Sequence, residues 1–195
     1  MIAKAIARIG TSYEREDNKK NDPEMLKKAL NFYNKSLSET RDKNIVANVK
    51  RIEKKLKELE KLALIDPEIF EQLKAEGNNC FKTGDFPGAI KKYDEARKRL
   101  DEKDQKLAAL FSNKAAALSK LMEYPSCISA CEQAIKVDKN FTKAYLRKAN
   151  ALEAMKKHSE AQKSYEEALK IDPASSEAQQ GYQRCVEATY FSRLQ

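Results

Sequence analysis

Apolar residues recur along this 195-residue chain at the three- and four-residue spacings of amphipathic helices. The clearest stripe lies in the segment 44–64, where Val49, Ile52, Leu56 and Leu59 share one helical face. Only 5 Gly and 5 Pro interrupt the chain, and runs of β-branched residues are scarce. Since Ala, Leu, Lys and Glu are abundant and favour helices, the pattern predicts an all-α fold.

One helical pattern occurs three times. The pattern is a small residue, then a second residue four positions later, then Ala three positions after that. The copies start at Ala89, Cys127 and Ala161. The copies begin 38 and then 34 residues apart. The longer first interval predicts about one extra helical turn at 98–106. A weaker fourth copy begins at Ala29.

A second helical pattern precedes each copy. Its middle position holds a small residue, Gly77, Ala115 or Ala149, which allows a paired helix to approach closely. Asp66 and Pro67 supply an N-cap and a proline in the first turn, and they predict the start of the first helix. The chain is therefore predicted to form antiparallel helix pairs.

This helix-turn-helix unit, with its interval of 34 residues, resembles the tetratricopeptide repeat (TPR). The Trp of the consensus is absent, and Leu73, Phe111 and Tyr145 occupy its position. The resemblance implies a right-handed superhelical solenoid of antiparallel helix pairs. A C-terminal capping helix, at about 176–191, would cover the last repeat.

The repeats divide the chain into three predicted parts. Residues 67–191 form three repeats and the cap, and residues 44–66 form an amphipathic linker or capping helix. Residues 1–43 form one repeat with an enlarged turn at 14–25. One repeat alone cannot bury its apolar face, so we expect this part to be the last repeat of a truncated upstream TPR domain.

Polar residues fall on the predicted inner face of the first helix of each repeat. Lys143 and Arg147 are four residues apart and share one helical face. Their like charges repel by a few tenths of a kcal/mol in isolation, which suggests that an anion binds between them. Each residue alone is equally typical of a solvated surface. The complete set is Lys74, Asn78, Asn113, Lys143 and Arg147.

With the surrounding segments Lys-Ala-Glu-Gly-Asn and Lys-Ala-Tyr-Leu-Arg, these five residues resemble the two-carboxylate clamp of the stress-inducible Hop family of co-chaperones. The resemblance covers the end of that family's middle TPR domain and the TPR domain that follows. It implies non-catalytic binding of the Glu-Glu-Val-Asp tails of the cytoplasmic seventy- and ninety-kilodalton heat-shock chaperones, without a cofactor.

The clamp roles follow from the side chains. Asn78 and Asn113 can donate to one carboxylate of the terminal Asp beside the charge of Lys74, while Lys143 and Arg147 hold the other. Two neighbouring roles are also expected, a small pocket for the Val at Ala116 and a contact from Lys120 to an upstream Glu.

An incomplete second clamp is predicted near the N-terminus. Lys4 and Arg8 repeat the spacing and phase of Lys143 and Arg147. Their partners would lie upstream, so we expect this second site to be non-functional.

The formal net charge of +8 leaves an alternative open, because a basic chain attracts any polyanion. A basic helical scaffold could bind nucleic acid, or a partner helix, without a clamp. Against nucleic acid stand the acidic residues between the basic ones at 44–64 and the lack of a nucleic-acid module signature. No apolar segment reaches the length of a membrane span, and Lys4 and Arg8 break the pattern of a signal peptide.

The cysteines are interpreted as packing residues. Cys127 and Cys131 could be half a metal site, but they occupy core positions of a TPR and no other Cys or His lies near them. No metal site is therefore predicted, and Cys80 and Cys185 are also read as core. Four Cys do not form a disulfide framework, which favours a reducing cytoplasm. No nucleophile–base–acid set suggests an enzyme.

Overall fold

The computed structural model describes residues 2–20, 22–39 and 42–192, with the backbone alone at 2, 16–20, 191 and 192. Within these ranges every regular element is a helix, which confirms the all-α prediction. In chain order the helices are α1 (Ile2–Lys20), α2 (Pro23–Glu39), α3 (Lys43–Ala63), α4 (Pro67–Lys82), α5 (Phe86–Arg97), α6 (Lys106–Lys120), α7 (Tyr124–Val137), α8 (Thr142–Ala154), α9 (His158–Ile171) and α10 (Ser176–Ser192).

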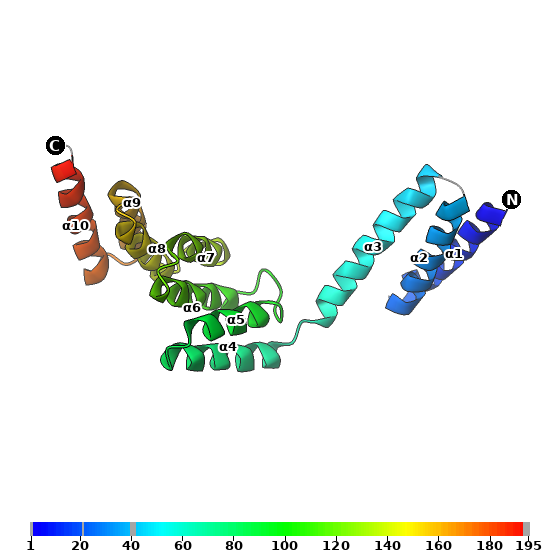
Figure 1. Cartoon of the computed structure of the whole chain (residues 1–195), viewed down its shortest axis with the longest axis horizontal. Helices are drawn as coiled ribbons and strands as arrows, with labels where there is room; N and C mark the ends of the chain where they lie inside the picture. Colours follow the sequence, from blue (N-terminus) through cyan, green and yellow to red (C-terminus); the bar gives the residue numbers. More distant parts are fainter. Residues whose placement is uncertain (1, 21, 40–41, 193–195) are drawn as a thin grey trace. The chain divides into compact units, whose positions relative to one another are not determined.

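The chain divides into two compact units, Met1–Leu64 and Ile65–Gln195. In the first unit, α1 and α2 form a helix pair and α3 packs along α2 (Figure 1). The apolar stripe of α3 faces this pair, and Ile52 at its centre is 1% exposed. The core of the unit consists of Leu26, Ala29, Tyr33, Ile45, Ile52 and Leu56.

The predicted enlarged turn at 14–25 is wrong, because 14–20 and 23–25 are helical. Helix α1 continues to Lys20, and α2 already begins at Pro23. Residue 21 lies outside the described residues. No Gly or Pro interrupts 14–20, so nothing in the sequence ends the helix before Pro23. The Asp22 side chain then accepts from the backbone N–H of Glu24 at 2.9 Å and starts α2.

The second unit is a stack of helix pairs, α4 with α5, α6 with α7 and α8 with α9 (Figure 1). Helix α10 packs on α9 and α8, as expected of a cap. Asp66 caps α4 by accepting from the N–H groups of Glu68 and Ile69, which confirms the predicted start of this helix. Small residues such as Ala89, Ala134 and Ala168 are fully buried between the helices.

The predicted extra helical turn at 98–106 is also wrong. Helix α5 ends at Arg97, and a non-helical loop leads to α6. The Asp101 side chain accepts from the backbone of Lys103 at 2.9 Å. Asp104 does the same for Lys106 at 2.8 Å. Such local side-chain bonds compete with helical ones, so the additional residues form turns.

Close approach between paired helices requires the glycine at position 77. A Cβ atom added to Gly77 would lie 2.6 Å from Cε1 of Tyr93. The Tyr93 ring on α5 therefore fills the space that a side chain on α4 would take.

The four cysteines are free thiols, three of them buried and Cys80 partly buried. Cys127 and Cys131 lie in the core beneath Ala115, Leu118 and Ala151. Among the described residues, no group of three or more His, Cys, Asp or Glu side chains is placed to hold a metal. Within the same ranges no helix is both long and apolar enough to cross a bilayer.

Candidate functional site

A cavity of about 330 Å³ lies among the first helices of the three pairs in the second unit. Asn78 from α4, Asn113 from α6 and Arg147 from α8 line it, so the fold brings together three of the five predicted clamp residues. Ala116, the predicted small pocket residue, lines it as well. The full lining is Asn78, Phe81, Lys82, Tyr93, Asn113, Ala116 and Arg147.

The two asparagines are oriented by a shared hydrogen-bond network. The Tyr93 hydroxyl donates to Oδ1 of Asn78 at 2.8 Å, and Nδ2 of Asn113 donates to the same oxygen at 3.1 Å. Because the Asn78 oxygen already accepts twice, its amide N–H groups are left to donate. Burial is the largest cause of the raised pKa of Tyr93, which keeps the hydroxyl protonated as a donor.

Arg147 is held in the cavity by a hydrogen bond from its guanidinium to Oγ of Ser112, a fully buried hydroxyl on α6. The pKa of Cys127 is lowered mainly by its hydrogen bond with Cys131, and the positive charge of Arg147 lowers it further. The same charge opposes the rise in the pKa of Tyr93. The guanidinium thus lies at the cavity wall as an oriented cation.

Lys74 lies one helical turn from Asn78 but does not line the cavity. Its ammonium pairs with Glu71 at 2.5 Å and lies 5.2 Å from the centroid of the Phe70 ring. Glu71 also pairs with Lys106 at 3.3 Å. The hydrogen bond from Lys74 is the main cause that lowers the pKa of the Glu71 carboxyl. Lys74 therefore already holds a carboxylate from its own helix.

The remaining predicted residues stay outside the cavity. Lys143 is exposed on α8, one turn before Arg147, and Lys120 is exposed at the end of α6. Lys4 and Arg8 are exposed on α1, in the other unit.

Three lining residues were missing from the sequence-based set. Lys82 follows Asn78 by four residues, so extending the Lys74–Asn78 spacing by one more turn would have found it. Tyr93 was identified only as a core position of the repeat. Phe81 showed no signal beyond its neighbours.

The lining of the cavity suits an anion. Its lining carries two cations, Lys82 and Arg147, and two amides, while none of its described residues is acidic. Amide and guanidinium N–H groups converging from three helices suit the oxygens of a carboxylate. Ala116 and Phe81 offer apolar surface beside them.

The third helix pair, α8 with α9, has the same tyrosine–asparagine hydrogen bond as the first pair, but carboxylates of the chain itself surround it. Tyr165 donates to Oδ1 of Asn150, as Tyr93 does to Asn78. There, however, Glu153 accepts from Tyr165 at 2.8 Å and from Arg184 at 2.8 Å. Asn150 in turn donates to Glu177 at 3.0 Å. Internal carboxylates occupy this position, so it is closed to an external one.

Comparison with known proteins places the chain among TPR proteins. The family model described as "Tetratricopeptide repeat" matches residues 142–175. Stress-induced-phosphoprotein 1 from Caenorhabditis elegans is 43% identical over 188 residues, which are 96% of this chain and 55% of the worm protein. The chain thus spans about half the length of this curated relative.

Two solved structures are similar to the chain. One is described as the TPR2AB domain of yeast Sti1 in complex with pHSP90; it has a TM-score of 0.81 and 37% identity, and the match covers 95% of this chain and 70% of that one. The other is described as the TPR2B domain of yeast Sti1 in complex with pHsp70, with a TM-score of 0.56, 36% identity, and coverage of 62% and 98%.

Proposed function

The chain belongs to the Hop/Sti1 family of TPR proteins, and from this membership we propose that its second unit binds the acidic C-terminal tails of heat-shock chaperones. The tails end in Glu-Glu-Val-Asp and belong to the seventy- and ninety-kilodalton classes. The protein acts as a non-catalytic adaptor in the cytoplasm. The observation that carries the proposal is the cavity that joins Asn78, Asn113 and Arg147.

The terminal Asp of the tail presents two carboxylates on one residue, which is the ligand that this arrangement suits. The amide N–H groups of Asn78 and the second N–H of Asn113 donate to one carboxylate, and Arg147 binds the other. Capture of a C-terminal carboxylate is an established mode of peptide recognition. The Val side chain lies against Ala116 and Phe81.

The lysines act at longer range. Lys82 adds charge inside the cavity, whereas Lys74 and Lys143 add it one helical turn before Asn78 and Arg147. Lys120 meets a Glu upstream in the tail. Exposed charges of this kind contribute about 0–1 kcal/mol each, so they tune the affinity more than they create it. We expect micromolar binding, about −7 to −8 kcal/mol.

Substitution of the cavity residues tests the proposal. We expect Asn113→Ala and Arg147→Ala each to weaken binding of a Glu-Glu-Val-Asp peptide about 10- to 100-fold, because each removes charge-assisted hydrogen bonds worth about 1.5–3 kcal/mol. Isothermal titration calorimetry measures the affinity, and circular dichroism checks that helicity is unchanged.

Lys163→Ala is the matched control, since Lys163 is exposed on α9 and lines no part of the cavity. It should bind the peptide as the unaltered chain does. Unchanged affinity in both cavity variants would contradict the clamp. If instead the chain shifts RNA in a gel and this survives the cavity variants, the basic-scaffold alternative is favoured.

The first unit is not expected to bind a tail by itself. Lys4 and Arg8 correspond to Lys143 and Arg147, and Thr11 stands where α8 has Asn150. The Thr11 hydroxyl is hydrogen-bonded to the carbonyl of Ala7 and to the Tyr33 hydroxyl. Tyr33 also donates to Glu14, which pairs with Arg51 at 2.5 Å. A buried carboxylate therefore already occupies the neighbourhood of this partial site.

A further inference from the structure

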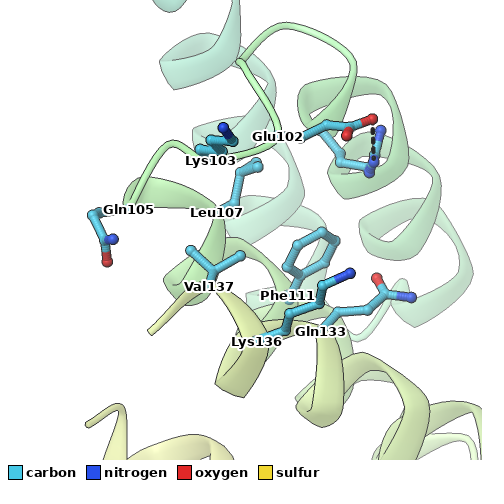
Figure 2. Close-up of a pocket in the computed structure, with 9 residues that line it drawn as sticks. Glu102, Lys103, Gln105, Leu107, Phe111, Gln133, Lys136 and Val137 are labelled. Atoms are coloured by element: carbon cyan, nitrogen blue, oxygen red, sulfur yellow. Dashed lines mark ion pairs between the residues drawn. The ribbon is translucent and has the colours of Figure 1, made fainter. Parts of the chain in front are cut away.

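The second unit, Ile65–Gln195, has another pocket, which shares no lining residue with the groove formed by the cavity of Asn78, Asn113 and Arg147. It has a volume of about 450 Å³ and is formed by the end of α5, the loop before α6, the start of α6 and the end of α7. Figure 2 shows Leu107, Phe111 and Val137 at its centre, with charged and amide side chains around them. The pocket thus combines an apolar floor with a polar rim.

The additional residues of the first repeat build one wall of this pocket. Glu102, Lys103 and Gln105 belong to the loop that makes the interval from the first copy to the second 38 residues instead of 34. The stacking of the helix pairs does not need these residues, because the interval between the later copies does without them. Their position gives the loop a role in shaping a pocket.

The charge of the rim is unbalanced. Arg97 pairs with Glu102 at 3.8 Å, as the dashed line in Figure 2 marks. Lys103 and Lys136 are exposed, and neither has an ion pair within the described part of the chain. The rim therefore carries three cations and one carboxylate, which suits an acidic ligand.

The shape of the surface indicates a chain segment rather than a small ion. A second hollow of about 470 Å³ continues from Gln133 between α5 and α7, with Ile90, Leu118 and Ala130 in its lining. Gln133 is common to both hollows. An extended peptide can follow this path, with one apolar side chain in the first pocket and its backbone near the glutamine amides.

We propose that this surface, which we call the loop pocket (Lys103, Leu107, Phe111, Gln133, Lys136 and Val137), binds an internal acidic segment of a partner protein that carries a single apolar residue. The apolar side chain packs on Phe111, Leu107 and Val137, and flanking carboxylates pair with Lys103 and Lys136. The segment needs no free C-terminus, which separates it from the ligand of the groove.

The test uses a probe that the groove cannot clamp. The peptide acetyl-Asp-Glu-Leu-Asp-Glu-amide, which lacks a terminal carboxylate, is titrated into the intact chain and followed by amide chemical shifts. We expect shifts at Lys103, Leu107 and Lys136 and not at Asn78 or Asn113. Replacing the Leu of the peptide by Gly should weaken binding about tenfold, through loss of its apolar burial.

Charge reversal separates the loop pocket from general attraction. The double variant Lys103→Glu/Lys136→Glu should weaken the peptide about tenfold or more. The matched variant Lys91→Glu/Lys163→Glu makes the same change in net charge at exposed lysines outside the pocket and should have little effect.

Several results would overturn the proposal: no shifts at millimolar peptide, shifts in the groove instead, or equal weakening in both double variants. If oligouridine changes the amide chemical shifts of the loop pocket and the peptide does not, the surface is assigned to RNA. Concentration-dependent self-association that Lys103→Glu/Lys136→Glu abolishes would assign it to a second copy. Because the probe has no C-terminal carboxylate, failure here leaves the proposed groove function untouched.

Discussion

Tyr93 connects the packing of the first helix pair to the groove. Its ring fills the space that Gly77 leaves open, and its hydroxyl fixes the oxygen of Asn78. The same tyrosine–asparagine pair recurs at Tyr165 and Asn150, where glutamates bind around it. The repeat therefore uses the same tyrosine–asparagine hydrogen bond to orient the asparagine in both helix pairs. The neighbouring residues determine whether that asparagine can bind an external carboxylate.

Glu71 is expected to compete with the ligand for Lys74. Glu71→Gln removes the carboxylate that pairs with Lys74 at 2.5 Å and with Lys106 at 3.3 Å. Lys74 then does not have to give up its ion pair with Glu71 when a peptide binds. An acidic-tail peptide should therefore bind about two- to fivefold tighter, which corresponds to the free energy of one exposed ion pair. Calorimetric titration of both proteins measures the difference.

Glu68→Gln is the control, because Glu68 is exposed on the same helix and its side chain has no ion pair in the described ranges. Weaker binding in Glu71→Gln, or the same gain in both variants, would show that Glu71 does not restrain Lys74. The pKa of Glu71 is lowered, so the pair stabilises the fold above the ordinary glutamate range. Its small contribution is lost as the pH falls through the lowered pKa.

The residues of the groove could be predicted from the sequence only where the repeat fixes them. Asn78, Asn113 and Arg147 occupy defined phases of the first helices, and the cavity contains all three. Lys82 was not found because its role depends on how far the cavity extends along α4. The pairing of Lys74 with Glu71 depends on side-chain conformation, which repeat spacing does not encode.

At the scale of elements, the turns inside the three helix pairs of the second unit share one backbone conformation. Gly84, Met122 and Lys156 follow the first helix of each pair and have φ values of 84°, 60° and 61°. This left-handed region favours glycine, and only the first pair has one. Met122 is 74% exposed, so its side chain contributes little packing in return.

Met122→Gly is therefore expected to stabilise the second unit by about 0.5–1 kcal/mol, because it relieves the left-handed backbone. The reverse change, Gly84→Ala, should destabilise it by about 1 kcal/mol, although no atom lies within 4 Å of the added Cβ. Urea denaturation followed by circular dichroism measures both. Destabilisation by Met122→Gly would mean that packing of the exposed methionine outweighs its backbone strain.

Helices with clear caps and stripes were predicted well, and the two connecting segments were not. The charged stretch 14–20 has no helix-breaking residue and stays helical, although a turn was predicted there. The segment 98–105 contains Asp101 and Asp104, whose side chains close local turns. Whether each segment is helical depends on local hydrogen bonds and on the presence of helix-breaking residues. The spacing of hydrophobic residues gives no information about either.

At the scale of the whole molecule, two compact units carry unequal sites. The unit Ile65–Gln195 has three helix pairs, a cap and a cavity lined by cations and amides. The unit Met1–Leu64 has one pair and α3, with an internal glutamate near its partial site. The formal net charge of +8 should speed the encounter with acidic tails and make binding fall with salt.

The most direct test of the account compares one Glu-Glu-Val-Asp peptide with its own C-terminal amide, by calorimetric titration of the intact chain at low and at near-physiological salt. We predict that the amide binds at least about tenfold more weakly at both salt concentrations, because a carboxylate between the asparagines and Arg147 has lost its charge. Equal affinities for the free acid and the amide would contradict the carboxylate clamp.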